Sequence, residues 1–315
     1  MIAKNFIISI GFLLSKLSYK TLEAIIQVLA RIYFLIPQKR KRLLLSNLTH
    51  AFPQWSEHKI KDTAKKSLNY LFEMGFFSLI YPHLSCQQRR STLMYSKKEE
   101  EEISDLSMSG KPTLILLPHL SLFETIATSP AFRPSGSKNL GAIYRPNSNP
   151  SIDKWINKSR IDLGLKTFSR KKGLIQAKKH LKDGNWLILL FDQNAGLGGD
   201  LSLFLNRICS VSPLPDIVLK GIPANVVLAT PFRSSFFRAE LKLHNLGGVR
   251  STSISKVVHQ KLETIIKDDP DGLPEWLWSH GKWKTQDNPH QIFHLHSKRS
   301  SLASEDQIPR KTKIW

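Results

Sequence analysis

The chain has 315 residues, of which 41% are hydrophobic and 23% are charged, a composition that excludes low-complexity, collagen-like and disordered proteins. Lysine and arginine number 46 against 25 aspartates and glutamates, so the formal net charge is +21. An excess of this size indicates an anionic partner: nucleic acid, an acidic protein or an anionic lipid surface. The two cysteines, Cys86 and Cys209, form no CxxC pattern, which argues against a disulfide scaffold and a thiolate zinc site and favours a reducing compartment.

The N-terminus carries two apolar stretches. The first, residues 5–15, is too short to cross a bilayer alone, because a span needs about 20 residues. The second, residues 21–36, contains Glu23 and Arg31, and the basic run 39–42 follows it. Helical spacing of the apolar positions next to a basic cluster is typical of anchoring at an anionic leaflet. We therefore expect residues 1–38 to form an N-terminal apolar helical anchor; the alternative is a core helix that ends at Pro37.

The pattern stays helical to about residue 81 and then changes, because short apolar runs alternate with helical segments. This alternation predicts an α/β fold with a mostly parallel central sheet flanked by helices. The predicted strands are 113–117, 139–144, 186–191, 224–229 and an edge strand at 238–243. The predicted helices between and after them are 151–163, 173–183 and 253–268.

Three regions follow from this organisation: a membrane-associated region, residues 1–38, a main domain, residues 39–285, and a mobile basic tail, residues 286–315. The tail contains His290, His294 and His296, but no nearby cysteine or carboxylate completes a ligand set. We expect no metal site.

The sharpest local signal is the segment 118–124, in which His119 directly follows a predicted buried strand. Ser121 and Glu124 have the spacing of a capping box, so a helix is expected to begin there. A carboxylate bonded to one imidazole nitrogen leaves the other as a general base for an attacking hydroxyl. Glu124 is one candidate for that carboxylate. Asp192, at the end of the predicted strand 186–191, is the other, and the sequence leaves the choice open.

Several short motifs occur in order along most of the chain. They are Asn47-Leu48…Phe52-Pro53…Ser56-Glu57 with Glu73, His119-x4-Glu124, Tyr144-Arg145-Pro146-Asn147 with Asn149-Pro150, Asp192-Gln193 with Gly196, and Pro274-Glu275…Trp278-Ser279-His280 with Lys284-Thr285. Together these motifs, within residues 40–285, resemble those of the bacterial lipid A biosynthesis acyltransferases, which carry out late acylation in lipopolysaccharide assembly. The resemblance implies that the main domain, residues 39–285, is an acyltransferase domain. The sequence departs from the family at Pro118, where many members have Asn, and at Gly281-Lys282, where paired arginines are common.

The resemblance implies an O-acyltransferase that moves a fatty acyl chain from an acyl-carrier-protein thioester to a hydroxyl of a lipid A precursor. It implies His119 as general base with Glu124 as its partner, no covalent acyl-enzyme, and no cofactor besides the thioester donor. It places the enzyme at the cytoplasmic face of the bacterial inner membrane.

Four further residues are expected to bind substrate: Arg145, Asn147, Asp192 and Gln193. Arginine's planar fork matches phosphate oxygens, so Arg145 is the candidate for a phosphate of the acceptor.

The basic segment 166–182 contains no acid, and within it Arg170, Lys171 and Lys172 are expected to dock the acidic carrier protein. A solvated helix face is the alternative.

Two other functions stay open. A glycerophospholipid acyltransferase would use the same chemistry. A nucleic-acid-binding protein would account for the charge but not for the ordered segments, so no nucleic acid is expected as a partner.

Overall fold

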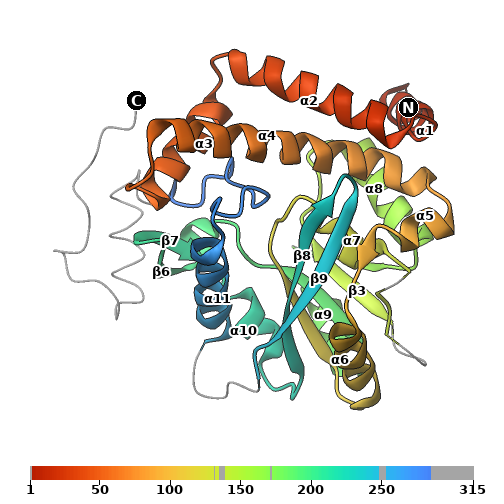
Figure 1. The fold of residues 1–315 in the computed structure, drawn as a ribbon. Helices are drawn as coiled ribbons and strands as arrows, with labels where there is room; N and C mark the ends of the chain where they lie inside the picture. Colours follow the sequence, from red (N-terminus) through yellow and green to blue (C-terminus); the bar gives the residue numbers. More distant parts are fainter. Residues whose placement is uncertain (1, 131, 135–138, 171, 248–252, 285–315) are drawn as a thin grey trace.

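The computed structural model describes residues 2–130, 132–134, 139–170, 172–247 and 253–284, and the expected tail 286–315 lies outside these residues. The N-terminal third is helical (Figure 1). Its helices are α1 (Ile2–Leu14), α2 (Tyr19–Leu35), α3 (Lys39–Ala51), α4 (Glu57–Ile80), the 3-10 turn η1 (Tyr81–His83) and α5 (Cys86–Arg90). The side chain of Ser56 accepts a hydrogen bond from the backbone N–H of Lys59 and so caps the start of α4.

A seven-stranded sheet forms the centre of the molecule, with the strand order β1-β9-β8-β2-β5-β3-β4. The strands are β1 (Leu93–Met94), β2 (Thr113–Leu117), β3 (Leu140–Tyr144), β4 (Lys166–Ser169), β5 (Trp186–Leu190), β8 (Asn225–Ser235) and β9 (Arg238–Asn245). The pairs from β8 to β4 are parallel, and only β8–β9 is antiparallel. The mostly parallel α/β sheet is confirmed, but β9 is no edge strand, because β1 pairs outside it.

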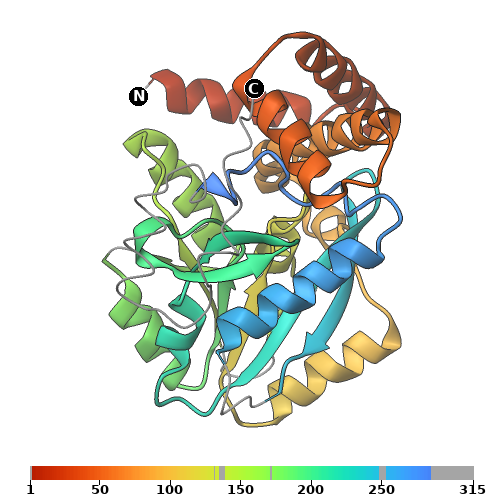
Figure 2. The ribbon, with the colours of Figure 1, turned by 90° about the vertical axis from the view of Figure 1, so that its left-hand side faces the viewer.

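Helices cover both faces of this sheet (Figure 2). They are α6 (Lys97–Met108), α7 (Glu124–Thr128), α8 (Pro150–Asp162), α9 (Leu174–Lys182), α10 (Leu214–Leu219) and α11 (Ile254–Asp268). A short 3-10 turn η2 (Gly196–Gly198) leads into a separate antiparallel hairpin, β6 (Asp200–Phe204) and β7 (Arg207–Val211).

Alternate residues of the central strand divide the apolar core into two halves. Leu114 and Leu116 of β2 face the half that also holds α9, α11 and the C-terminal tryptophans. Ile115 and Leu117 face the half that holds α2, α6 and the end of α4. This is the pattern expected of a strand buried on both faces, whose sequence reads as a continuous apolar run.

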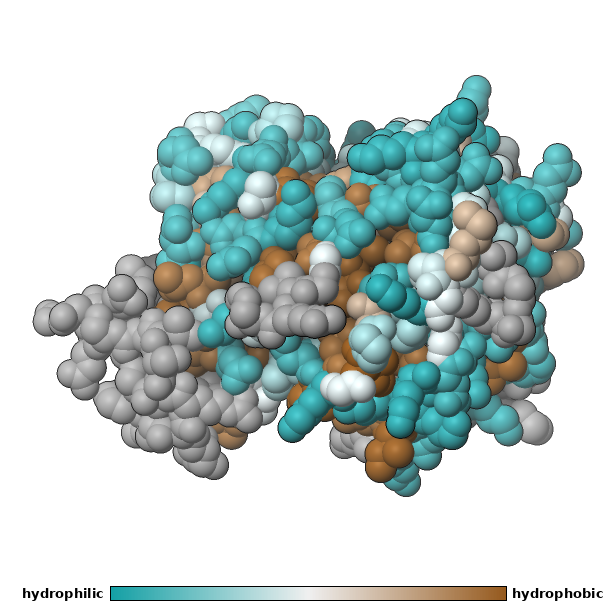
Figure 3. Space-filling model, turned by 90° about the horizontal axis from the view of Figure 1, so that it is seen from below, coloured by the Kyte–Doolittle hydropathy of each residue, from teal (hydrophilic) through white to brown (hydrophobic). Residues whose placement is uncertain are grey.

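The helix α4 spans the carboxyl-terminal edge of the sheet, and α2 packs on its outer side through the buried residues Leu22, Ile26 and Ala30 (Figure 1). The opposite face of the molecule has a hydrophilic rim around a more apolar middle (Figure 3). Among the described residues, no helix combines the length and the apolar character needed to cross a membrane. The carboxyl-terminal edge under α4 is where ligands bind in sheets of this kind.

Candidate active site

His119 lies directly beyond the carboxyl end of β2, separated from it by Pro118. Two backbone hydrogen bonds fix its position. Its N–H donates to Oδ2 of Asp192 over 2.9 Å, and its carbonyl accepts from the N–H of Leu277 over 3.1 Å. The imidazole therefore stands at the edge of the sheet, held by the loop after β5 and by the C-terminal segment, and 16% of its side chain is exposed.

Asp192 is the carboxylate that meets the His119 ring. Its Oδ1 lies 2.5 Å from Nδ1 of His119, and its Oδ2 also accepts from the indole Nε1 of Trp276 over 2.8 Å. Only 2% of Asp192 is exposed. Burial alone would raise the pKa of Asp192, but the His119 ring and backbone and the Trp276 indole outweigh it and hold that pKa well below its usual range. An ionised Asp192 keeps the proton of His119 on Nδ1, which leaves Nε2 with its lone pair.

The side-chain amide of Gln193 forms a hydrogen bond with this second ring nitrogen. Its Nε2 lies 3.1 Å from Nε2 of His119, and since the ring proton is on Nδ1, the amide donates this hydrogen bond. A substrate hydroxyl that binds His119 must therefore displace the Gln193 amide.

The loop 192–194 is held in turn by the C-terminal block, residues 274–284. The backbone N–H of Asn194 donates to Nε2 of His280 over 3.0 Å, and its side-chain Nδ2 donates to the carbonyl of Lys282 over 2.7 Å.

Glu124 does not meet His119 in this structure; it forms an ion pair with Arg160 of α8. The expected capping box is absent, because α7 begins at Glu124 with Phe123 as its N-cap. The hydroxyl of Ser121 instead donates to Glu275 over 3.4 Å. The helix thus starts two residues later than the capping box predicts, and Glu124 takes its place in the first turn of α7, next to α8. Of the two carboxylates that the sequence suggested as partners of His119, it is Asp192 that forms a hydrogen bond with the imidazole.

The remaining expected substrate residues stand along the same edge of the sheet. Arg145 and Asn147 follow β3 and are exposed. The Asn147 side-chain oxygen accepts from the N–H of Asn149, so this amide also shapes the turn into α8. Arg170 and Lys172 follow β4 and are exposed, and Lys171 lies outside the described residues. His119 follows β2 and Arg170 follows β4, and the sheet order β2-β5-β3-β4 puts these two strands three positions apart. Three strand spacings correspond to about 14 Å across the sheet.

Four residues of the C-terminal block surround the site without having been assigned a role from the sequence: Glu275, Trp276, His280 and Lys282. Burial raises the pKa of Glu275 to about 7, against the opposing effect of hydrogen bonds from Arg233 and Ser121. Burial, aided by the charges of His119, Lys282 and Arg145 and opposed by Asp192, lowers the pKa of His280 to about 4. The C-terminal motif that contains these four residues was the only sequence feature that pointed to them. A motif does not show which group each side chain contacts, so their roles could not be assigned from the sequence.

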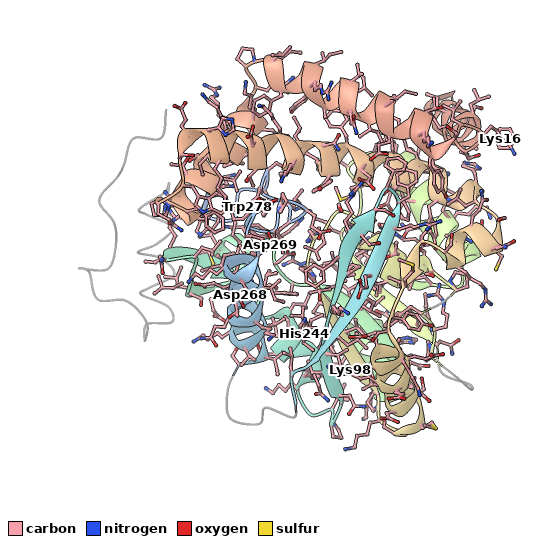
Figure 4. All side chains as sticks on the ribbon, in the orientation of Figure 1. Lys16, Lys98, His244, Asp268, Asp269 and Trp278 are labelled. Atoms are coloured by element: carbon pink, nitrogen blue, oxygen red, sulfur yellow. The ribbon has the colours of Figure 1, made fainter. Side chains whose placement is uncertain are left out.

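A shallow hollow that is partly open to solvent lies at this edge of the sheet and is lined by His119. Its walls come from the helix α4 and from the C-terminal block. They include Leu68, Leu71, Met74, Ser121 and Glu275. Figure 4 shows Trp278, which also lines it, between α4 and the upper end of α11. In the described part of the chain, no group of three or more His, Cys, Asp or Glu side chains could hold a metal ion, and the tail histidines lie outside that part.

Comparison with known families supports the resemblance seen in the sequence. Residues 2–285 match the family model described as bacterial lipid A biosynthesis acyltransferase. No curated protein matches the chain significantly.

Proposed function

The chain belongs to the bacterial lipid A biosynthesis acyltransferases, and from this premise we propose that it transfers a fatty acyl group from an acyl-carrier-protein thioester to a hydroxyl of a lipid A precursor. The observation that carries the proposal is the His119 ring, whose Nδ1 is bound by the ionised Asp192 while Nε2 points toward Gln193. This arrangement suits a general base for an alcohol.

In the proposed reaction, the acceptor hydroxyl replaces the Gln193 amide at Nε2 of His119. The hydroxyl oxygen attacks the thioester carbonyl as its proton passes to Nε2, and a tetrahedral intermediate forms. The carbon–sulfur bond then breaks, the ester remains, and the departing thiolate takes the proton back from His119. The displaced Gln193 amide is available as a donor to the oxyanion. This route needs neither an acyl-enzyme nor a cofactor.

The acceptor's phosphate is proposed to bind Arg145, one strand beyond Asp192 along the sheet edge. Asn147 is proposed to assist by holding the loop after β3.

An assay of the purified protein tests the function. With an acyl-carrier-protein thioester as donor, ester formation on a lipid A precursor is expected, and His119→Ala should abolish it. The same assay with glycerol phosphate as acceptor tests the alternative function. Preferred acylation of glycerol phosphate would make the enzyme a glycerophospholipid acyltransferase.

The carrier protein is proposed to dock on the basic loop that contains Arg170, Lys171 and Lys172. An acidic partner would be attracted there in a salt-sensitive way. The double variant R170E/K172E should raise the KM for the carrier thioester by about tenfold at low salt and leave KM for the acceptor unchanged. The matched control is K97E/K98E on α6, far from this edge (Figure 4). Equal KM values in both variants would contradict the docking site.

The N-terminal helices are proposed to lie on the anionic cytoplasmic face of the bacterial inner membrane. The outer side of α1 and α2 exposes several large apolar side chains, and the basic run Lys39–Arg42 follows them. These apolar residues are Phe12, Leu13, Leu17, Val28, Ile32, Leu35 and Ile36.

Vesicle sedimentation tests this location. The wild type should sediment with anionic vesicles and far less with neutral ones. I32E/L35E should lose this binding, whereas Met108→Glu, at an equally exposed apolar residue of α6, should retain it. Binding that survives I32E/L35E would contradict the proposal.

A further inference from the structure

A second carboxyl group, that of Glu275, lies at the hollow that His119 lines. Glu275 stands two residues before Leu277, whose backbone N–H donates to the carbonyl of His119 over 3.1 Å. Its Oε2 accepts from the hydroxyl of Ser121, two residues after His119, over 3.4 Å. The Glu275 carboxyl group is therefore tied to the chain on both sides of His119.

His119 stands between two carboxyl groups that come from opposite sides of β2. Asp192 follows β5, one neighbour of β2 in the sheet, and binds the imidazole. Glu275 is held against β8, the other neighbour, because its two oxygens accept from the backbone N–H of Arg233 over 3.1 and 2.9 Å. The first carboxyl group is thus used by the histidine, and the second is left for a ligand in the hollow.

The donors that hold the Glu275 carboxyl group are uncharged. They are the peptide N–H of Arg233 and the hydroxyl of Ser121, and among the described residues Glu275 forms no ion pair. The guanidinium of Arg233 pairs with Glu73 instead, with its Nε 2.7 Å from Oε2 of that residue. Burial without a counter-charge in contact favours the neutral form of a carboxyl group. The surroundings of Glu275 therefore favour the protonated acid.

The titratable groups around Glu275 support this protonation state. Burial raises the pKa of Glu275 to about 7, and the charge of Asp269, beyond the upper end of α11, adds to the effect (Figure 4). The hydrogen bonds from Arg233 and Ser121 and the charge of Arg233 oppose it. Burial also raises the pKa of Tyr70 of α4, which lines the same hollow, so this phenol adds no negative charge in the neutral range.

The protonation states of the two carboxyl groups therefore differ. Asp192 is ionised, since its pKa is held well below the usual range, whereas Glu275 keeps its proton up to about pH 7. Carboxyl groups whose pKa values are moved apart in this way divide the acid and base roles of an active site. Oε1 of Glu275 accepts only the longer branch of the Arg233 bond, so it is the oxygen that can carry the proton and offer it to a ligand.

We propose that the carboxyl group of Glu275 is a further substrate-contacting group of the site and donates a hydrogen bond to the carbonyl oxygen of the acyl thioester. The proposal rests on the proposed function. As the acceptor hydroxyl attacks, this oxygen gains negative charge, and a donor fixed in place stabilises it. The proton stays on Glu275, so the proton transfer to His119 and the bonds that form and break are unchanged. An ionised Glu275 would lack the donor and repel the oxyanion.

The test measures kcat/KM for the carrier thioester between pH 6 and pH 9, because this ratio reports groups that titrate in the free enzyme. The wild-type ratio should fall by about tenfold per pH unit once Glu275 ionises above about pH 7. Glu275→Gln keeps a donor that does not titrate, so it should lose less than about tenfold at pH 6 and should lack the alkaline fall. Glu275→Met, similar in size but without a donor, should lose about 10²–10³-fold at pH 6.

The matched control is Glu102→Gln on α6, because burial also raises the pKa of Glu102 but this residue lies outside the hollow. This variant should follow the wild-type pH profile. Thermal unfolding at each pH shows which proteins are folded at the assay temperature, which separates a loss of stability from a loss of kcat/KM.

Three results would overturn the proposal: an alkaline fall that persists in folded Glu275→Gln, a folded Glu275→Met as active as Glu275→Gln, or a wild-type kcat/KM that does not fall above pH 7. The proposed function fails separately, if the wild type is inactive with every carrier thioester at every pH.

Discussion

The indole Nε1 of Trp276 donates a 2.8 Å hydrogen bond to Oδ2 of Asp192, across 84 positions of sequence. Since the other oxygen of Asp192 meets Nδ1 of His119, the C-terminal block helps to orient the carboxylate that orients the imidazole. The same block clamps the His119 carbonyl through Leu277 and the following loop through His280. The terminal motif thus stabilises the geometry of a site formed by residues more than eighty positions upstream.

Removal of the indole donor should reduce turnover without unfolding the protein. Trp276→Phe loses the hydrogen bond to Asp192, and because that bond is charge-assisted, a decrease in kcat of about tenfold is expected with little change in KM. The matched control is Trp283→Phe, since the Nε1 of Trp283 donates to the backbone carbonyl of Phe204 over 3.1 Å. This control should lower stability but keep kcat. Equal losses of kcat in the two variants would contradict a role for the Trp276 donor.

The ion pair between Glu73 and Arg233 joins α4 to β8. Arg233 Nε lies 2.7 Å from Oε2 of Glu73, whose other oxygen accepts from the N–H of Phe237, and Glu73 is fully buried. Arg233→Met leaves this carboxylate without its counter-charge, so the free energy of unfolding should fall by about 3–5 kcal/mol. In the double variant E73Q/R233M, much of this loss should be restored, as urea denaturation would show. A double variant no more stable than Arg233→Met would exclude the unpaired charge as the cause.

Glu275 should make stability depend on pH in the neutral range. Its pKa is raised to about 7 by burial from a usual value near 4.5, so the folded protein binds a proton that the unfolded chain releases between these values. Its contribution is therefore fully present below pH 4.5 and is lost as pH rises through about 7. Glu275→Gln removes this dependence. The stability difference between wild type and Glu275→Gln, taken from urea midpoints at pH 5 and pH 8, should shift in favour of the variant at pH 8 by roughly 1–3 kcal/mol. A constant difference would show that Glu275 titrates alike in both states.

The central strands could be predicted because burial on both faces of a parallel sheet produces continuous apolar runs, as in β2 and β5. The strand β4 was not predicted, because it has no continuous apolar run: Lys166 is exposed and only Phe168 of its four residues is fully buried. The hairpin β6–β7 was not predicted for a similar reason, because most residues of β6 are half-exposed and its sequence pattern is typical of a loop. The hairpin turn, Leu205-Asn206, has positive φ at both residues. Of these two residue types only Asn is common at positive φ, so the sequence gives little indication of this turn.

In the site, His119 could be placed from the strand that precedes it, whereas the identity of its carboxylate partner could not. Glu124 and Asp192 have equivalent chemistry, and the choice depends on the start of α7 and on the register of β2 with β5, where Leu117 pairs with Leu190. This register brings the two following loops together and places Asp192 at the imidazole. The partner of Glu124, Arg160, lies 36 positions away on α8, and no local spacing predicts it.

The central claim is that Asp192 orients the His119 general base, and one comparison tests it most directly: the kcat of Asp192→Asn against that of Glu124→Gln in the acyl-transfer assay. An amide at position 192 no longer holds the ring proton on Nδ1, so Asp192→Asn should lower kcat by about 10³–10⁴-fold, as expected when the tautomer of a catalytic imidazole is lost. Glu124→Gln weakens only the contact with Arg160 and should lower kcat much less. If Asp192→Asn retains most of the wild-type kcat while Glu124→Gln abolishes turnover, the account of the site is contradicted.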